Sequence, residues 1–202
     1  MERNSNQEPW LFSRGPGRRA VWHAPFVGAG LLVALATFSL VANAKLGKAG
    51  GASTTFKAAG PAGLTIEGVT SDMTIADDGT SVTITVPLTA LKTGIELRDK
   101  HTKDAIEADK YPTTTLTVAR AALKFPGAGA ESSGDAHGQL ALHGQTRDVT
   151  FHYVAKQSGD TLSVKASARI NVDDFGVKRP SYLGVTVKPD VDVTTTFDAR
   201  DN

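Results

Sequence analysis

Cysteine is absent from the 202-residue chain. Without cysteine, no disulfide can brace the fold, and no lipidated cysteine can tether the protein to a bilayer. The stability of the chain must therefore come from burial of apolar surface, and a chain of this length is large enough to bury a core of its own.

Tryptophan and surplus charge are also scarce. Both tryptophans, Trp10 and Trp22, fall within the first 44 residues, so a carbohydrate-stacking platform further along the chain is not expected. The 22 basic and 21 acidic residues include four and two, respectively, before residue 45, which leaves 18 basic and 19 acidic residues after it. Binding to nucleic acid or to an anionic membrane surface requires a basic patch. We therefore expect no nucleic-acid partner and at most transient contact with a membrane.

Catalytic signatures are missing as well. The sequence contains no Gly-x-Ser-x-Gly elbow, no cysteine nucleophile and no His-Glu-x-x-His pair. The histidines beyond residue 44 are scattered: His101, His137, His143 and His152. We therefore expect a protein that is not an enzyme and that uses neither a metal nor another cofactor. Zinc stays open as an alternative, because three ligands can meet in space without a fixed spacing in sequence.

The first 44 residues have the pattern of an export signal. Arginines precede an uncharged run, residues 24–44, that is rich in Leu, Val and Ala. The run ends in Ala42-Asn43-Ala44, the small-x-small pattern that a signal peptidase needs, directly before Lys45. We predict a signal peptide over residues 1–44 and a periplasmic or secreted location for the remainder.

Two features of this segment leave alternatives open. The uncharged run is nearly as long as the roughly 20 residues that span a bilayer, so an uncleaved anchor is the alternative to cleavage. Its glycines, Thr37 and Ser39 make it a weak membrane span. The adjacent Arg18 and Arg19 allow either the general secretory route or the twin-arginine route.

Beyond the export segment, apolar residues recur at every second position, which is typical of half-buried strands. We predict a short linker over residues 45–52 and a single all-β domain over residues 53–202, with a flexible loop at 126–138. The predicted strands cover 54–59, 64–71, 81–87, 113–119, 121–125, 138–143, 149–156, 161–170 and 191–197.

One segment departs from this alternation. Residues 94–108, "GIELRDKHTKDAIEA", contain good helix formers and place Leu97, His101 and Ala105 on one side of a helix. Pro112 disfavours helical geometry at Tyr111, which ends the segment. A sheet with one apolar face must hide that face, either in a sandwich or in a closed barrel. A lone helix across one end is a common companion of a barrel.

Five motifs occur in an order that resembles the YceI-like family of periplasmic proteins: "TGIELRDKH", "DKYP", "GQLALHGQTRDV", "DDFGV" and "LGVTVKPDVDV". The resemblance covers about residues 53–197. It implies an antiparallel eight-stranded lipocalin-like barrel with one short helix, whose apolar interior binds an isoprenoid or another fatty amphiphile. Members of the family are described as lipid binders or stress-related proteins.

Within such a barrel, the alternating faces and the helix predict which residues surround a ligand. Small inward residues such as Ala166 and Ala168 leave volume for it. The predicted lining consists of Ile84, Val86, His101, Phe151, Tyr153, Leu162, Val164, Ala166, Ala168 and Phe175. Interiors are normally close-packed, so a filled barrel that serves as a structural or interaction domain is the alternative.

Arg98 and Asp99 lie beside His101 in the predicted helix. We interpret them as a structural cluster, paired with each other or capping nearby backbone groups through charge-assisted hydrogen bonds. Catalysis by the Arg-Asp-His cluster is the third alternative for the function.

The export interpretation makes a direct prediction. Cleavage between Ala44 and Lys45 should produce an exported form that lacks residues 1–44. Intact-mass measurement of the protein released by the cell tests this, and a mass that includes those residues would contradict it.

Overall fold

The structure is a computed structural model that describes residues 45–179, 181–182 and 185–201; the predicted signal peptide, residues 1–44, lies outside the described residues. The elements, in chain order, are β1 (Leu46–Ala59), η1 (Pro61–Gly63), β2 (Thr65–Thr70), β3 (Thr74–Asp77), β4 (Ser81–Pro87), α1 (Glu96–Ala105), β5 (Thr113–Ala119), η2 (Arg120–Ala122), β6 (Glu131–Leu142), β7 (Gln145–Ser158), β8 (Thr161–Asn171), η3 (Val172–Phe175), β9 (Ser181–Tyr182), β10 (Val185–Thr186) and β11 (Asp190–Asp201).

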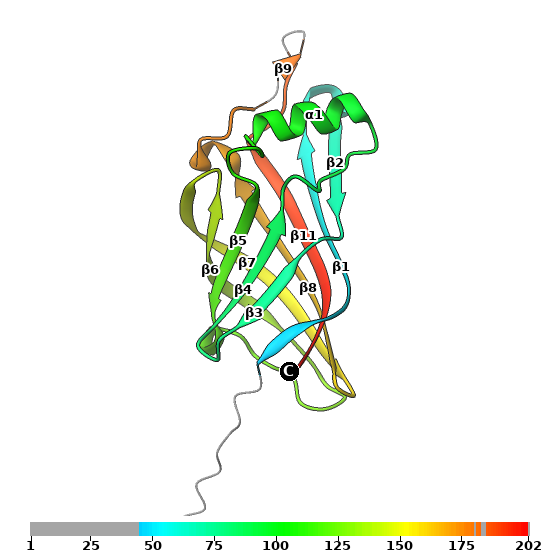
Figure 1. Ribbon diagram of the computed structural model, residues 1–202, viewed down its shortest axis with the longest axis vertical. Helices are drawn as coiled ribbons and strands as arrows, with labels where there is room; N and C mark the ends of the chain where they lie inside the picture. Colours follow the sequence, from blue (N-terminus) through cyan, green and yellow to red (C-terminus); the bar gives the residue numbers. More distant parts are fainter. Residues whose placement is uncertain (1–44, 180, 183–184, 202) are drawn as a thin grey trace, which may run out of the picture. The chain divides into compact units, whose positions relative to one another are not determined.

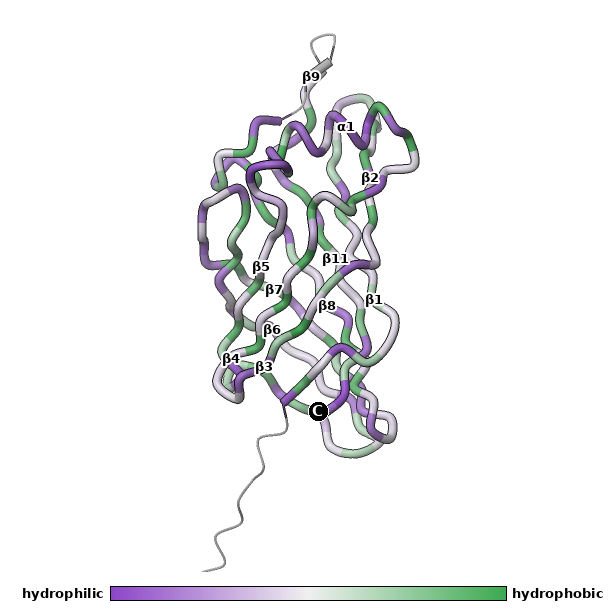
Figure 2. The backbone as a smooth tube through the Cα atoms, viewed as in Figure 1, coloured by the Kyte–Doolittle hydropathy of each residue, from purple (hydrophilic) through white to green (hydrophobic). Residues whose placement is uncertain are grey.

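The described strands form one curled antiparallel sheet of nine strands and a separate β9–β10 hairpin (Figure 1). The order across the sheet is β2-β1-β11-β8-β7-β6-β5-β4-β3. Green and purple segments alternate along several strands in Figure 2, as expected for a sheet with one apolar face. The prediction of an all-β, antiparallel barrel-like fold with one short helix is confirmed, with nine described strands in the sheet where the family resemblance implied eight.

One strand was missed, and one predicted strand was wrong. The short strand β3 was missed, because four residues are too few to display alternation. Residues 121–125 were predicted as a strand, whereas the chain turns into the 3₁₀ helix η2 at Arg120. The backbone N–H of Arg120 donates to the carbonyl oxygen of Thr80, in the β3–β4 turn, at 2.8 Å. The chain leaves the sheet at this point.

The predicted linker and the predicted loop are also corrected. Residues 46–52 belong to β1 and pair with β11, with a register shift between Lys48 and Ala52. Residues 131–138 belong to β6 and pair with β7. Residues 131–138 have no bulky apolar side chain and residues 46–52 have one, Leu46. Neither segment therefore shows apolar alternation, and side-chain alternation does not reveal their backbone hydrogen bonds.

A buried carboxylate helps to close the sheet at one end. The Asp77 side chain, at the end of β3, has no exposed surface and forms an ion pair with Arg120. Its oxygens also accept hydrogen bonds from the backbone N–H of Leu46 in β1, at 3.1 Å, and of Gly79, at 2.8 Å. Asp77 therefore joins the start of β1 to the β3 edge of the curled sheet.

At the opposite, helix-bearing end of the seam between the two sheet edges, a backbone bridge is formed. Val69, in the edge strand β2, exchanges two hydrogen bonds with Lys92, which lies between β4 and α1: Val69 N–H to Lys92 O is 2.8 Å and Lys92 N–H to Val69 O is 2.9 Å. The helix-bearing end of the barrel is thus held at its edge by one isolated bridge.

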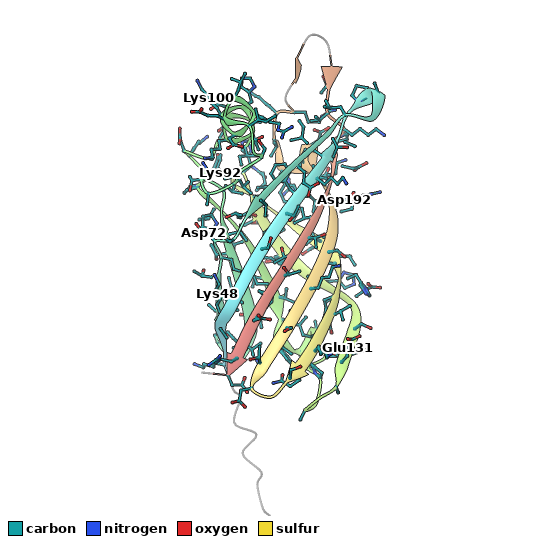
Figure 3. All side chains as sticks on the ribbon, turned by 90° about the vertical axis from the view of Figure 1, so that its right-hand side faces the viewer. Lys48, Asp72, Lys92, Lys100, Glu131 and Asp192 are labelled. Carbon is teal, nitrogen blue, oxygen red and sulfur yellow. The ribbon has the colours of Figure 1, made fainter. Side chains whose placement is uncertain are left out.

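The enclosed apolar face divides into two clusters. The first cluster, at the Asp77 end, contains Leu46, Met73, Val86, Val118, Ala136, Phe151, Tyr153, Ala155, Leu162, Phe197 and Ala199. The second, at the helix end, contains Ala58, Leu88, Leu91, Ala108, Leu142, Ile170, Phe175, Val177 and Val191. Charged side chains project outward, as the six labelled in Figure 3 illustrate, and all six are exposed.

Removal of the Asp77 carboxylate should destabilise the barrel strongly. Asp77→Ala leaves the mostly buried Arg120 without its partner and two backbone N–H groups without an acceptor, so we expect a loss of about 3 kcal/mol in the free energy of unfolding. Urea denaturation measures it. Asp148→Ala, which removes an exposed carboxylate on β7, is the control and should change stability by less than about 0.5 kcal/mol. Equal stabilities of the two variants would contradict the closing role of Asp77.

Candidate functional site

Helix α1 lies across one end of the barrel, the same end as the β9–β10 hairpin (Figure 1). It is shorter than the predicted 94–108 because the chain before Glu96 is extended at Ile95 and the chain after Ala105 forms turns. The helix is therefore placed as a cover over the interior of the sheet, and its anchoring determines how that end is closed.

Arg98 and Asp99 anchor the entry to this helix through Thr93. Asp99 Oδ1 accepts hydrogen bonds from the backbone N–H and the hydroxyl of Thr93, both at 2.5 Å. Arg98 Nη2 donates to the carbonyl oxygen of Thr93 at 2.6 Å. The two side chains thus hold the same loop residue, and Thr93 directly follows Lys92 of the seam bridge.

These hydrogen bonds affect the titration of Asp99. The Thr93 hydroxyl and, next, the Thr93 backbone N–H lower the pKa of Asp99 below its ordinary value of 3.8. A carboxyl with a lowered pKa in the folded state contributes stability that is present above its unfolded pKa and is lost as the pH falls through the folded value. The helix anchor should therefore weaken in acid.

The inner face of the helix was predicted only in part. Ala105, one of the three residues predicted on one side of the helix, lines the space below it together with Thr102 and Ile106. The prediction that His101 faces the interior was wrong: His101 is exposed, and Leu97 is 64% exposed. The inward residues follow the i, i+3, i+4 spacing from Thr102.

Beneath the helix lies an apolar cavity of about 240 Å³. Its walls come from strands on all sides of the sheet and from α1. Five of the ten predicted lining residues are in these walls: Ile84, Val86, Phe151, Ala166 and Ala168. The other apolar wall residues include Phe56, Ile66, Leu88, Leu91, Leu116, Leu140, Leu142, Val149, Ile170, Val177, Val187, Val191 and Val193.

The remaining predicted residues do not line this cavity. Tyr153, Leu162 and Val164 belong to the filled cluster at the Asp77 end, where the Tyr153 hydroxyl accepts a hydrogen bond from the backbone N–H of Lys124 at 2.6 Å. Phe175 is 2% exposed and packs in the second cluster without reaching the cavity wall. Side-chain alternation places a residue on the inner face but does not indicate how far along the barrel the interior is filled.

Phe56 is a wall residue that the sequence analysis missed. It pairs across strands with Gly68, and a Cβ atom at position 68 would lie 2.3 Å from Phe56 Cε1. Gly68 thus makes room for the Phe56 ring against the sheet. A glycine inside a strand indicates such a close approach, and "IEGVT" carried that signal.

The charged residues of the cavity wall, within the described part of the chain, are Arg179 and Lys188, both cationic. Arg179 Nε donates to Asp173 Oδ1 at 2.9 Å, and its Nη1 donates to the carbonyl oxygen of Val187 at 3.1 Å. The backbone N–H of Lys188 donates to the carbonyl oxygen of Ala59 at 2.7 Å. These bonds hold the Arg179 guanidinium and the backbone of Lys188 at the base of the β9–β10 hairpin.

The histidines do not converge. The His143 ring is within hydrogen-bonding distance of the Phe175 carbonyl oxygen at 3.0 Å and lies 3.5 Å from Glu107, whereas the exposed His137 and His152 contact Thr150 and Asp135. Among the described residues, no group of three or more His, Cys, Asp or Glu side chains is placed to hold a metal ion. None of the described helices has both the length and the apolar character needed to cross a membrane.

A curled antiparallel sheet with an apolar cavity under one capping helix defines the lipocalin-like class of barrels. A model of the YceI-like domain matches residues 48–199. The chain belongs to the YceI-like family.

Curated relatives match over part of their length. A UPF0312 protein of Pseudomonas putida (strain W619) is 32% identical over 104 residues, which are 48% of this chain and 52% of the relative. A UPF0312 protein of Pseudomonas fluorescens (strain SBW25) is 30% identical over 102 residues, 46% of this chain and 50% of the relative. The chain thus spans about half the length of the curated relatives it matches.

Solved structures share the fold at low sequence identity. A polyisoprenoid binding domain from Saccharophagus degradans, implicated in plant cell wall breakdown, superposes with a TM-score of 0.67 at 14% identity, over 79% of this chain and 99% of that domain. Burkholderia cenocepacia BcnA gives a TM-score of 0.57 at 17% identity, over 72% of this chain and 95% of that protein.

The Thr93 anchor yields a pH-dependent prediction. Thr93→Val removes the hydroxyl that contributes most to the lowered pKa of Asp99, so the melting temperature of the variant should fall less steeply than that of the wild type between pH 5 and pH 3, with the unfolded carboxyl titrating near 3.9. Thermal melts across this range test it. Thr196→Val, at an exposed position on β11, should retain the wild-type slope, and identical slopes for all three proteins would contradict the prediction.

Proposed function

We propose that this protein is an exported, soluble binder of an isoprenoid or another amphiphilic lipid, whose apolar chain occupies the cavity beneath α1. The apolar cavity carries the proposal, because its walls are formed almost entirely by aliphatic and aromatic side chains. A lining of that kind offers few partners for a polar ligand and excludes ordered water.

The energetics favour a hydrocarbon occupant. Each methylene group moved from water into the cavity contributes about 0.8 kcal/mol, so even a short tail gains several kcal/mol of binding free energy. An apolar cavity of roughly 150 Å³ is already enough to hold a benzene molecule. The cavity of about 240 Å³ is larger.

The filled barrel is the competing function. It accounts for the Asp77 end, where Tyr153, Leu162 and Phe197 belong to one buried cluster, but not for the cavity at the helix end. The family membership and the fold shared with a polyisoprenoid binding domain support the lipid binder. No residues are assigned to catalysis in this proposal, and the Arg98–Asp99 cluster has a structural role at the helix entry.

The setting of this function is the periplasm or the exterior of the cell, as the predicted export segment indicates. In that aqueous setting, a hydrocarbon chain needs a protein to shield it from water. Sequestration or transport of the lipid, with a stress-related role, follows from such shielding. Contact with a membrane would be transient, limited to loading and release.

Mass spectrometry of an organic extract tests the proposal most directly. The protein purified after export, without added lipid, should release a stoichiometric isoprenoid or fatty amphiphile. An extract without any such molecule, combined with no uptake of added farnesol or palmitate, would favour the filled barrel.

Blocking the cavity should abolish this binding. Ala166 lines the cavity and lies opposite Tyr153 and Thr195 on the neighbouring strands. In Ala166→Phe, the new ring occupies the volume that the lipid chain needs, so lipid retention should be lost while the melting temperature stays near that of the wild type. Lys165→Phe, exposed on the same strand, is the matched control and should retain the lipid. In a filled barrel the Ala166 change would overpack the interior and cost about 1–3 kcal/mol, which a melting curve would reveal.

A further inference from the structure

Arg179 and Lys188 point to the chemistry of the head group. We propose that the two cations form a subsite for an anionic head group, phosphate or carboxylate, so that this chain selects acidic amphiphiles over neutral ones. The inference rests on the proposed function, because the head-group subsite belongs to the same cavity. It goes further by naming the class of ligand.

The charge of the cavity wall supports this assignment. Within the described residues, Arg179 and Lys188 are the charged lining residues, and no carboxylate lines the cavity. Asp173 compensates Arg179 in part, through Nε at 2.9 Å. Lys188 has no carboxylate within 4.0 Å among the described residues. The wall therefore carries a net positive charge, which favours an anion over a neutral or cationic head.

The Arg179 guanidinium and the backbone at Lys188 are also held in place before any ligand arrives. The hydrogen bond from Arg179 Nη1 to the Val187 carbonyl oxygen, at 3.1 Å, links the chain before β9 to the residue next to Lys188. The bond from Lys188 N–H to Ala59 O, at 2.7 Å, attaches the same point to the end of β1. Preorganised groups lose less conformational entropy on binding.

Arg179 and Lys188 both have side-chain N–H groups that can donate hydrogen bonds to a ligand. A guanidinium has five N–H donors, and Arg179 uses two of them in the bonds to Asp173 and Val187. The Lys188 side chain, which is exposed, has no hydrogen-bond partner among the described residues. A phosphate or carboxylate beside the cavity can therefore accept charge-assisted hydrogen bonds while its tail stays within the apolar walls.

The test uses the full chain and tails that are matched except for the head: farnesyl diphosphate against farnesol, and palmitate against 1-hexadecanol, by calorimetry at pH 7.5. Wild type should bind the anionic member of each pair about tenfold more tightly. Lys188→Gln should remove most of that preference and leave the affinity for farnesol unchanged. Lys188→Arg should keep the preference, and Lys165→Gln, an exposed cation elsewhere on the barrel, should behave as wild type.

The outcomes separate the two proposals. Equal affinity for anionic and neutral members, unaffected by Lys188→Gln, overturns the head-group subsite and leaves the lipid-binding function standing. No binding of any of the four ligands overturns the lipid-binding function itself. Inorganic diphosphate that binds as tightly as farnesyl diphosphate would assign the cations to a free anion and overturn the head-group subsite. A preference in the diphosphate pair alone supports phosphate as the head, and a preference in the palmitate pair alone supports carboxylate.

Discussion

The buried carboxylate of Asp77 is the constraint on which the barrel depends. A curled sheet has two edge strands, and its apolar face stays dry only if those edges are brought together. Asp77 does this at one end by accepting hydrogen bonds from Leu46 and Gly79 while it pairs with Arg120. The other end relies on the two hydrogen bonds between Val69 and Lys92 and on the helix above them. The two edges of the sheet are thus joined by a buried ion pair at one end of the barrel and by a single backbone bridge at the other.

This asymmetry matches the division of the interior. At the Asp77 end, Tyr153, Leu162 and Phe197 pack between the strands. Toward the helix the wall includes smaller residues, Ala166 and Ala168 among them, and a cavity remains. The tightly closed end supplies stability through burial of apolar surface. The helix end, anchored through Thr93 by Arg98 and Asp99, contains the cavity in which we propose that the lipid binds.

Much of this could be predicted from the sequence, because alternation reports which side chains face inward. The inner face of β8, with Ala166 and Ala168, and the single helix are examples. Alternation has no information on depth, so Tyr153 and Ala166 looked equivalent although one fills the interior and the other borders the cavity. It is also silent where pairing rests on the backbone alone, as in residues 46–52. The rotation of α1, which turns His101 outward, depends on the Thr93 anchor, whose hydrogen bonds no periodicity encodes.

In the proposed lipid binder, the filled end would limit the length of the hydrocarbon chain that the barrel can shield. Tyr153, whose hydroxyl accepts a hydrogen bond from the backbone N–H of Lys124, belongs to the buried cluster at that end. Each methylene group inside the cavity would add to the binding free energy, whereas methylene groups left outside in water would add nothing. Such a barrel would discriminate among hydrocarbon chains by their length, without a polar contact to the tail.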